Sequence, residues 1–540
     1  MRMGSRLLLV TAIAAIAGPL PALAKKQDFI NCDGLQAPKA SGNGMRPPPN
    51  TPYMYNSQRF SIAACDAALA DPLLLPSHTL RRASLLRARA IGHLSAGNAD
   101  QTLADIDAAH EATRELFSDP MFARSMGVSF DLVRAAAWQR KGDFARARQL
   151  AQAAGDARPY SVSVQSLVAS LLEATSGPGE DPSPYAKVIP LKPTAIKEEF
   201  YWLVEKHRFS QALQTYPRLG LEFPQLQPDP NGTRLINTSE NINTLTTSMV
   251  LAMFAAYAHA ATGNTDAAQS LLSDTKAKVE AALAPLSMLE RVAYAKNLNL
   301  FGEKLALMVS GRIDITQGKA INVVKSLVGQ QLPATPLTVE LLTALKTALP
   351  AEQQDLAPDP APMAAKVAEN AKVSGLDISA LKKHLPAAEF SNNATEYKKS
   401  KKSILNVLLS PSNYRPDGFR SKEDPETGVI TVEFIGGSAT PTTVDELTLL
   451  HAADLARQRG KTGFIIVSRS LYARTMTTTI NGMSTSSAPA GYQATLDIRL
   501  IDADNLPADL QLEGDRVLDA NKVYGALAPI YISPEDARSS

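Results

Sequence analysis

The stretch that decides the fold is VSFDLVRAAAWQRKGDFARARQLAQAAGDARPYS, which runs from Val128 to Ser161. It contains two Ala- and Leu-rich segments whose apolar spacing is typical of packed helices rather than strands. Gly142 lies between them, where the lack of a Cβ permits a tight turn, and Pro159 ends the second segment. Alanine occupies the positions where facing helices must approach closely: Ala135, Ala147 and Ala154. The stretch therefore predicts a helical hairpin.

Two other parts of the chain follow the same pattern. Ala83–Leu116 turns at Gly97, and a third unit turns at Gly263, while Lys206–Phe209 has the form of a degenerate turn. Over its full 34 residues the first hairpin resembles a tetratricopeptide repeat. Short helices that recur in pairs with glycine between them indicate a stacked solenoid. We therefore expect an all-α, tetratricopeptide-like helical-repeat domain over residues 56–348.

The N-terminal residues have the features of a secretory signal peptide. Arg2 and Arg6 precede the apolar run Leu7–Ala17, and a small-residue site follows at Ala22–Ala24. The run is shorter than the roughly 20 residues that span a bilayer, so a retained anchor is the weaker interpretation. We expect residues 1–24 to be removed after Ala24 and the mature protein to be periplasmic or secreted in a Gram-negative bacterium, with no transmembrane segment left.

The chain has two cysteines, Cys32 and Cys65. Cysteines exported to an oxidising compartment can pair, and we predict one disulfide between them. It would restrict the unfolded chain by roughly 3–4 kcal/mol in the entropic model and would hold a Pro-rich arm, residues 25–55, on the first helix. Two unpaired thiols are the alternative. Metal binding is disfavoured because no histidine lies nearby in the sequence.

In the C-terminal quarter of the chain the spacing of the apolar residues changes from a helical to a strand-like period. After a linker with one possible helix near Ala364–Lys372, residues 403–540 alternate like strands. Thr443–Glu446 has the spacing of a capping box for a helix that stops at Gly460. Four strands are expected: Val429–Ile435, Gly463–Ser468, Tyr472–Ile480 and Tyr492–Ile501. This region, which follows the linker 349–402, predicts a small mixed α/β domain, so the chain is multidomain.

Within this domain the order of motifs is Gly436-Gly437-Ser438, Leu449–Leu455, Gly463–Val467 and Tyr492–Ile498. It resembles a small domain of bacterial, especially alphaproteobacterial, envelope proteins and lipoproteins of unknown function, over about residues 415–532. The resemblance implies no catalytic residues. The chain departs from the pattern because it has no cysteine placed for acylation and because it carries the Thr/Ser-rich stretch Thr475–Ser487.

Composition and motifs argue against several functions. The 55 Lys+Arg balance 53 Asp+Glu, so the chain lacks the basic excess of a nucleic-acid binder. The seven histidines are dispersed without metal-ligand spacing, and we expect no metal and no cofactor. Ser273–Lys276 and Lys461–Gly463 imitate parts of a serine acyl-transferase signature, but they lie in different domains and no S-D-N element separates them, so we interpret them as chance matches.

The remaining candidates concern binding. In a tetratricopeptide-like solenoid the first-helix residues Arg87, Gln139, Arg140 and Tyr257 would line an inner groove and contact an envelope protein or peptide. Arg81, Arg82, Arg87 and Arg89 can instead be explained by surface pairing with Asp105 and Asp107. The sequence thus favours a non-catalytic periplasmic scaffold. The alternative is an envelope hydrolase or transferase in the C-terminal domain that uses His451 and a Ser or Thr hydroxyl.

Overall fold

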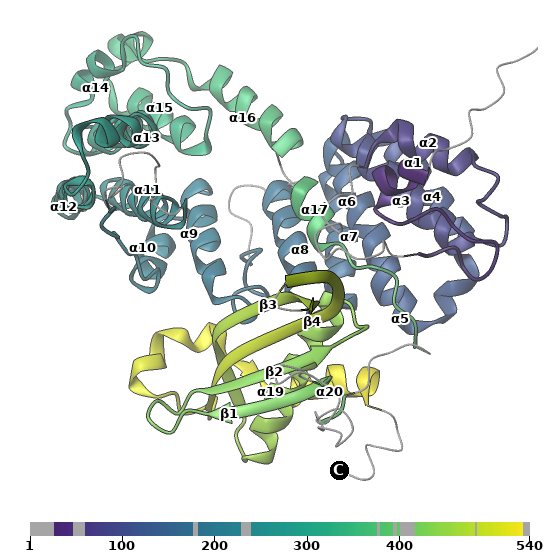
Figure 1. Ribbon diagram of the computed structural model, residues 1–540. Coiled ribbons are helices and arrows are strands. Elements are labelled where there is room, and N and C mark those ends of the chain that lie inside the picture. The colour runs from purple at the N-terminus through teal and green to yellow at the C-terminus, as the bar shows by residue number, and fades with distance from the viewer. Residues whose placement is uncertain are drawn as a thin grey trace, which may run out of the picture. The chain divides into compact units, whose positions relative to one another are not determined.

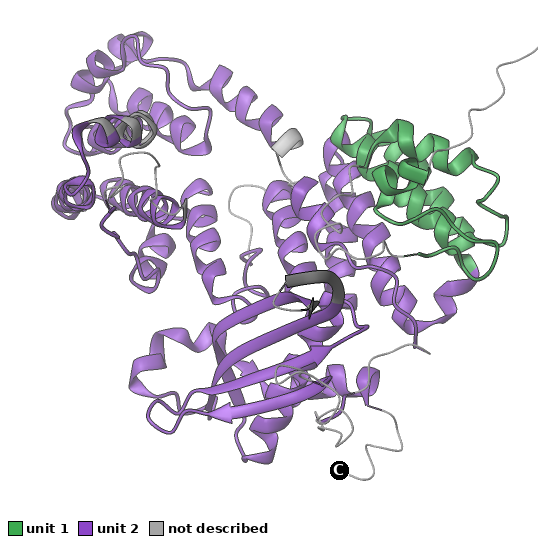
Figure 2. Cartoon of the chain, viewed as in Figure 1, with its two compact units in different colours: residues 1–114 green, residues 115–540 purple. Residues whose placement is uncertain are grey.

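The computed structural model describes residues 26–46, 60–176, 182–227, 239–374, 378–391, 397–399, 416–480 and 483–532. The chain forms two compact units, residues 1–114 and 115–540 (Figure 2). The predicted signal peptide and the prolines from Pro47 to Pro52 lie outside the described residues.

The first unit is helical, and its N-terminal helix is tied to the others. Its helices are α1 (Lys26–Asp33), α2 (Ile62–Ala70), α3 (Thr79–Ser95) and α4 (Ala99–Ala112) (Figure 1). The Cys32–Cys65 disulfide joins α1 to α2, which confirms that prediction. Phe29 and both cysteines are fully buried. The arm is therefore not wholly extended, because its first residues form a packed helix.

The arginines of α3 do not all pair on the surface with Asp105 and Asp107, as the sequence predicts. Arg81 is not on the surface: its side chain is fully buried and pairs with Asp33 of α1, which also accepts a 2.8 Å hydrogen bond from Ser84. Arg89 does pair with Asp105, at 2.6 Å, and it also reaches Asp66. The predicted partner Asp105 is therefore right for Arg89, although Asp105 is buried, and surface pairing is wrong for Arg81, which anchors α1.

The second unit begins with a long helical block. Its helices are α5 (Pro120–Phe122), α6 (Val128–Lys141), α7 (Phe144–Ala157), α8 (Val162–Thr175), α9 (Ile196–Glu205), α10 (Phe209–Thr215), α11 (Ser239–Ala261), α12 (Thr265–Leu283), α13 (Met288–Thr316), α14 (Ala320–Leu327) and α15 (Pro336–Ala348). A π-helical turn, Ala123–Gly127, joins α5 to α6.

The helical hairpins form where the sequence places them. Gly97, Gly142 and Gly263 have φ values of +84°, +81° and +91°, in the left-handed region that favours glycine. The degenerate turn also joins two helices, α9 and α10, but there the non-glycine His207 takes φ +57°. Such a backbone is strained for a residue with a side chain.

Helix α11 is long and apolar. Among the described residues, its stretch Glu240–Ala261 is long and apolar enough to cross a membrane. In its most apolar 18-residue window, two thirds of the residues are buried. Such burial is what a core helix of a folded block shows.

The predicted linker is more ordered than expected. In place of one helix it contains α16 (Pro360–Ser374), which includes the predicted Ala364–Lys372, and α17 (Ile378–His384), after a 3₁₀ turn at Ala351–Leu356. Of the lysines near residue 400, Lys398 and Lys399 are described, and Lys399 forms a parallel bridge with Phe419. Part of this segment is therefore attached to the C-terminal sheet.

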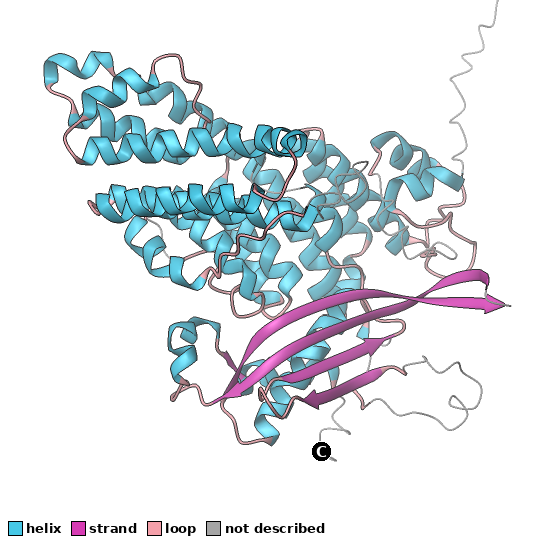
Figure 3. Cartoon of the chain, turned by 60° about the vertical axis from the view of Figure 1, so that its left-hand side comes forward, coloured by secondary structure: helices cyan, strands magenta, loops and turns pink. Residues whose placement is uncertain are grey.

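The C-terminal region is an antiparallel sheet with two helices. Its elements are β1 (Gly418–Glu423), β2 (Ile430–Gly436), α19 (Pro441–Gln458), β3 (Gly463–Ile480), β4 (Met483–Ile501), β5 (Leu518–Asp519) and α20 (Ala520–Tyr531). The strand order is β1-β2-β4-β3-β5 (Figure 3). The two strands expected between residues 463 and 480 are one continuous strand, and β1 was not predicted.

The C-terminal region shares its hydrophobic core with the helical block. The side chains of β2, β3 and β4 that pack against α19 and α20 form one buried cluster with Met121 of α5 and Leu191. The sequence places the start of this domain near residue 403, but the cluster also includes residues that precede that position.

Candidate functional site

Helix α19 brings an acidic side chain into the core. Its N-cap is Thr440, whose hydroxyl accepts a hydrogen bond from the Thr443 backbone N–H, and Pro441 takes the first helical position. The predicted capping box at Thr443–Glu446 is therefore wrong, because the helix begins three residues earlier. Glu446 lies one turn inside the helix and is fully buried.

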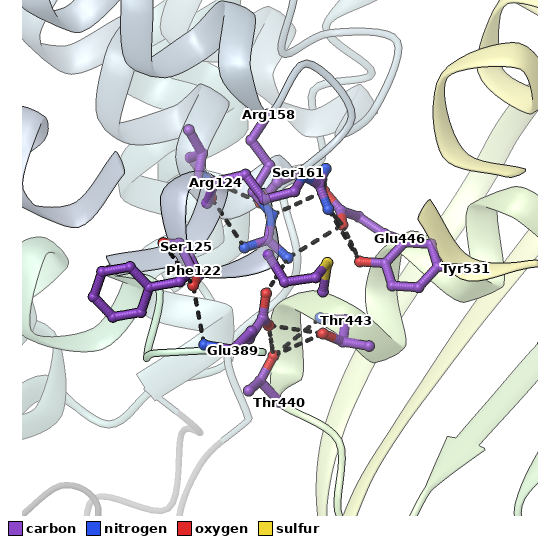
Figure 4. A network of polar contacts seen from close by, with 12 residues as sticks. Phe122, Arg124, Ser125, Arg158, Ser161, Glu389, Thr440, Thr443, Glu446 and Tyr531 are labelled. Carbon is purple, nitrogen blue, oxygen red and sulfur yellow. Dashed lines mark hydrogen bonds and ion pairs between the residues drawn. The ribbon is translucent and has the colours of Figure 1, made fainter. Parts of the chain in front are cut away.

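Two arginines of the helical block bind Glu446 (Figure 4). Arg158 donates from Nε and Nη2 to the two carboxylate oxygens at 3.0 and 3.1 Å. Arg124 also donates twice, at 3.1 and 3.2 Å. The hydroxyl of Tyr531, from α20, donates to the same carboxylate. Bidentate charge-assisted bonds of this kind are among the strongest polar contacts in proteins.

A second carboxylate, Glu389, completes the cluster from the segment after α17. Its Oε2 lies 3.0 Å from Arg158 Nη2, and its Oε1 accepts hydrogen bonds from the hydroxyls of Thr440 and Thr443. Its backbone N–H donates to Ser125 Oγ at 3.0 Å. We call Arg124, Arg158, Glu389, Glu446 and Tyr531 the ionic junction.

The ionic junction is formally neutral and closed. Burial alone would raise the pKa of Glu446, but Arg158 and Arg124 lower it to about 2. Burial likewise raises the pKa of Tyr531, and the neighbouring Glu446 raises it further. A carboxylate that accepts this many hydrogen bonds and titrates so low is a poor proton donor or acceptor near neutral pH. The geometry therefore indicates a structural connection between the α/β domain, the segment after α17 and the helical block.

His451 lies in a second closed cluster on α19. It is 6% exposed, and its Nδ1 lies 2.9 Å from the Tyr397 hydroxyl, which donates to Asp454 Oδ2 at 2.9 Å. The phenol has one proton and donates it to Asp454, so the hydrogen bond between Tyr397 and His451 uses a proton on Nδ1. In the neutral imidazole this leaves Nε2 with only a lone pair. Nε2 is buried without a partner among the described residues. Phe419 stacks on the imidazole, with ring centroids 4.1 Å apart.

This cluster does not favour the hydrolase alternative. The partner of His451 is a phenol, and neither a serine nor a threonine hydroxyl hydrogen-bonds to it among the described residues. None of the three cavities described below is lined by His451. Burial, with a smaller effect of Lys399, lowers its pKa to about 4, so the imidazole is neutral at neutral pH.

The lowered pKa of His451 predicts a pH dependence of stability. As the pH falls, the unfolded chain, in which histidine has its ordinary pKa of about 6.5, binds a proton before the folded chain does. The stability that the neutral His451 contributes is therefore complete above about pH 6.5 and is lost as the pH falls towards 4. The loss is at most about 1.4 kcal/mol per pH unit. The free energy of unfolding, measured in urea at about pH 7.5 and about pH 5, should change less between the two pH values for His451→Gln than for the parent protein. Equal changes in the two proteins would contradict the assignment.

None of the four predicted groove residues lines one of the cavities described below. Gln139 is buried and donates to the Ala371 carbonyl of α16 at 3.1 Å. Tyr257 is fully buried, and its hydroxyl donates to Glu340 of α15. Arg140 is half-buried, and so is Arg87, in the first unit. The expected exposure of Gln139 and Tyr257 is therefore wrong, because later helices of the same chain cover them.

An open cavity lies instead on α11, α12 and α13, and its lining does not include the predicted groove residues. A groove of about 400 Å³ has Met249 and Met253 of α11 as its floor. Its walls come from α12 and α13: Lys276, Val279, Glu280, Leu283, Gly302, Glu303, Ala306, Leu307 and Ser310. We call it the α11–α13 groove. Gly302 keeps it open next to Met249, because an added Cβ would lie 3.3 Å from the methionine sulfur.

Two further cavities lie in the helical block. One, of about 450 Å³, is lined by residues that include His207, Arg312 and Glu340, and in it Arg312 pairs with Glu340 at 3.3 Å. The other, of about 420 Å³, contains Lys187 and Asp156, which pair at 2.8 Å. Among the described residues no group of three or more histidine, cysteine or acidic side chains could hold a metal ion.

The sequence matches no protein-family model, and comparisons with curated proteins and with solved structures find no similar protein.

Proposed function

We propose that the protein is an exported, non-catalytic interaction scaffold whose helical block, related to tetratricopeptide repeats, binds a helical segment of another envelope protein. The signal-peptide pattern of residues 1–24 and the Cys32–Cys65 disulfide support an oxidising compartment outside the cytoplasm. The observation that carries the binding role is the α11–α13 groove.

The surface of the α11–α13 groove suits an amphipathic helix. Val279 and Leu283 lie four residues apart on α12, and Ala306 and Leu307 face them from α13. Two helical walls with apolar side chains at this spacing can hold the apolar stripe of a third helix. The methionine floor can adapt to different apolar side chains because methionine is flexible and polarizable.

The rim of this groove is charged. Lys276, Glu280 and Glu303 are exposed, and they form no ion pair with the described residues. By contrast, each of the other two cavities holds an ion pair, Lys187–Asp156 in one and Arg312–Glu340 in the other. Unpaired charges around an apolar floor are available to fix the direction of a bound helix.

The titratable clusters support a non-catalytic role. The ionic junction and the His451 cluster are both buried, and no described cavity opens onto either. A catalytic constellation needs a place for a reacting atom close to its acid, base or nucleophile. Among the described residues, these clusters offer no such place for a hydrolase or transferase site in the C-terminal domain.

Affinity capture with groove variants tests the proposed function. Mature protein bound to a resin should retain a partner from detergent extracts of its own cell envelope. Val279→Asp combined with Leu307→Asp should reduce capture at least about tenfold, since two carboxylates in an apolar groove must be desolvated on binding.

The matched control combines Val328→Asp with Leu356→Asp, which alters exposed apolar side chains of the second unit outside the groove. It should capture as much as the parent, and both variants should keep the parent's melting temperature. A capture that is equal for the groove variant and the control, or no capture at all, would refute the proposed role of the groove.

A further inference from the structure

Helix α16 runs from the part of the second unit that contains α15 to the part that contains α6 (Figure 1). It contacts α15, and its Met363 packs against the main core cluster of the helical block. It also contacts α6 and α8, and near its end the Ala371 carbonyl accepts the 3.1 Å hydrogen bond from Gln139 Nε2. Gln139 is 2% exposed, so the side of α6 that carries it, which we call the Gln139 face, is closed.

The contact between α16 and Gln139 uses the end of a helix. Because α16 ends at Ser374, the Ala371 carbonyl is one of its last four. The last four carbonyls of an α-helix have no partner within the helix and are satisfied from outside it. Gln139 supplies such a donor from α6. The contact depends on a backbone carbonyl and not on the identity of a side chain, so the end of another helix can take the same place.

The burial of α16 is small for a helix of 15 residues. From Pro360 to Ala371 no side chain is fully buried, and the half-buried ones form a single stripe: Pro360, Met363, Val367 and Ala371. The shorter helix α15 buries five side chains: Leu337, Thr338, Leu341, Leu342 and Leu345. A helix of this length is marginally stable alone in water, and an element with few buried contacts opens locally at low free energy. Helix α16 can therefore leave α6 while the helices beneath it stay folded.

We infer that α16 is a releasable strap, which closes the Gln139 face of α6 and uncovers it by local opening. In the closed state Gln139 donates to α16, and in the open state the same amide is available to the carboxyl end of a partner's helix. This face is separate from the α11–α13 groove, whose lining contains no residue of α6 or α16. The strap therefore controls access to a second surface of the helical block and does not depend on the proposed role of the groove.

Thiol labelling tests the strap in the full mature chain. Because the natural cysteines are bonded to each other, an introduced cysteine is the only free thiol. In the folded protein Gln139→Cys should react with a thiol reagent at least about a hundredfold faster than Ala137→Cys, since local opening needs less free energy than unfolding of the block. Ala137 is the matched control because it is fully buried on the opposite side of α6, about 200° around the helix.

Hydrogen exchange of the parent protein gives a readout that needs no substitution. Amides of α16 should exchange at least about a hundredfold faster than those of α15 in native buffer. Equal protection of the two helices would overturn the inference, because α16 would then open only together with the block.

Two aspartate substitutions test whether the half-buried stripe holds the strap. In the Gln139→Cys protein, Val367→Asp adds a charge to this stripe and should raise the labelling rate at least about tenfold. Ala368→Asp adds the same side chain at an exposed position of α16 and should change the rate by less than about twofold. Both variants should keep the parent's melting temperature. Equal effects of the two aspartates, or equal labelling of Gln139→Cys and Ala137→Cys, would also overturn the inference.

Discussion

Replacing Glu446 with alanine is expected to lower the free energy of unfolding by about 3–5 kcal/mol. The substitution leaves Arg158, which is fully buried, without the carboxylate that accepts two of its hydrogen bonds, and it removes both bonds to Arg124. An arginine cannot neutralise itself by losing its proton, so the uncompensated charge stays in the core. Urea unfolding at neutral pH, followed by circular dichroism, measures the change.

Glu423→Ala is the matched control for this substitution. Glu423 also pairs with an arginine, Arg459, at 2.6 Å, but both side chains are more than 40% exposed. Solvent screens such a pair, and its loss should cost less than about 1 kcal/mol. If Glu446→Ala is no more destabilising than Glu423→Ala, the ionic junction does not hold the second unit together.

Removal of the disulfide should have the second largest effect, confined to the first unit. Cys32→Ser combined with Cys65→Ser is expected to destabilise that unit by about 3–4 kcal/mol, because the bond closes a long loop in the unfolded chain. Helix α1 should lose its packing first, since Cys32 and Phe29 are its fully buried apolar residues. Hydrogen exchange of the α1 and α2 amides, read by mass spectrometry, reports this loss locally.

The parent protein treated with a thiol reductant should reproduce the exchange pattern of the double variant. Amides of α11 and α12, in the other unit, provide the internal control and should keep their protection. Free thiols at both cysteines in exported protein, or unchanged exchange in α1 after reduction, would contradict a stabilising disulfide.

Local sequence patterns predicted much of the helical block. The hairpins at Gly97, Gly142 and Gly263 were predictable because each turn needs a left-handed residue, and glycine between two apolar-periodic segments marks it. The predicted start of α19 is wrong because Thr440 and Thr443 both have the form of an N-cap. Pro441 discriminates between them, since proline favours the first helical position and would clash further inside the helix.

The ionic junction could not be predicted from sequence spacing. Glu446 lies 288 residues from Arg158 and 322 from Arg124, and no local period connects them. The predicted exposure of the groove residues Gln139 and Tyr257 is wrong for a related reason. The repeat pattern assigns Gln139 and Tyr257 to an inner face, but it does not show that α16 and α15 of the same chain cover that face.

The central claim is that an exported scaffold binds its partner in the α11–α13 groove, and site-specific photocross-linking in intact cells tests it most directly. A photoreactive amino acid at Ser310, on the exposed wall of the groove, should give a discrete cross-linked product in the periplasmic fraction from a chain that begins at residue 25. The same probe at Val328, outside the groove, should give none. Equal products from both positions, or a chain that stays uncleaved in the cytoplasm, would contradict the claim.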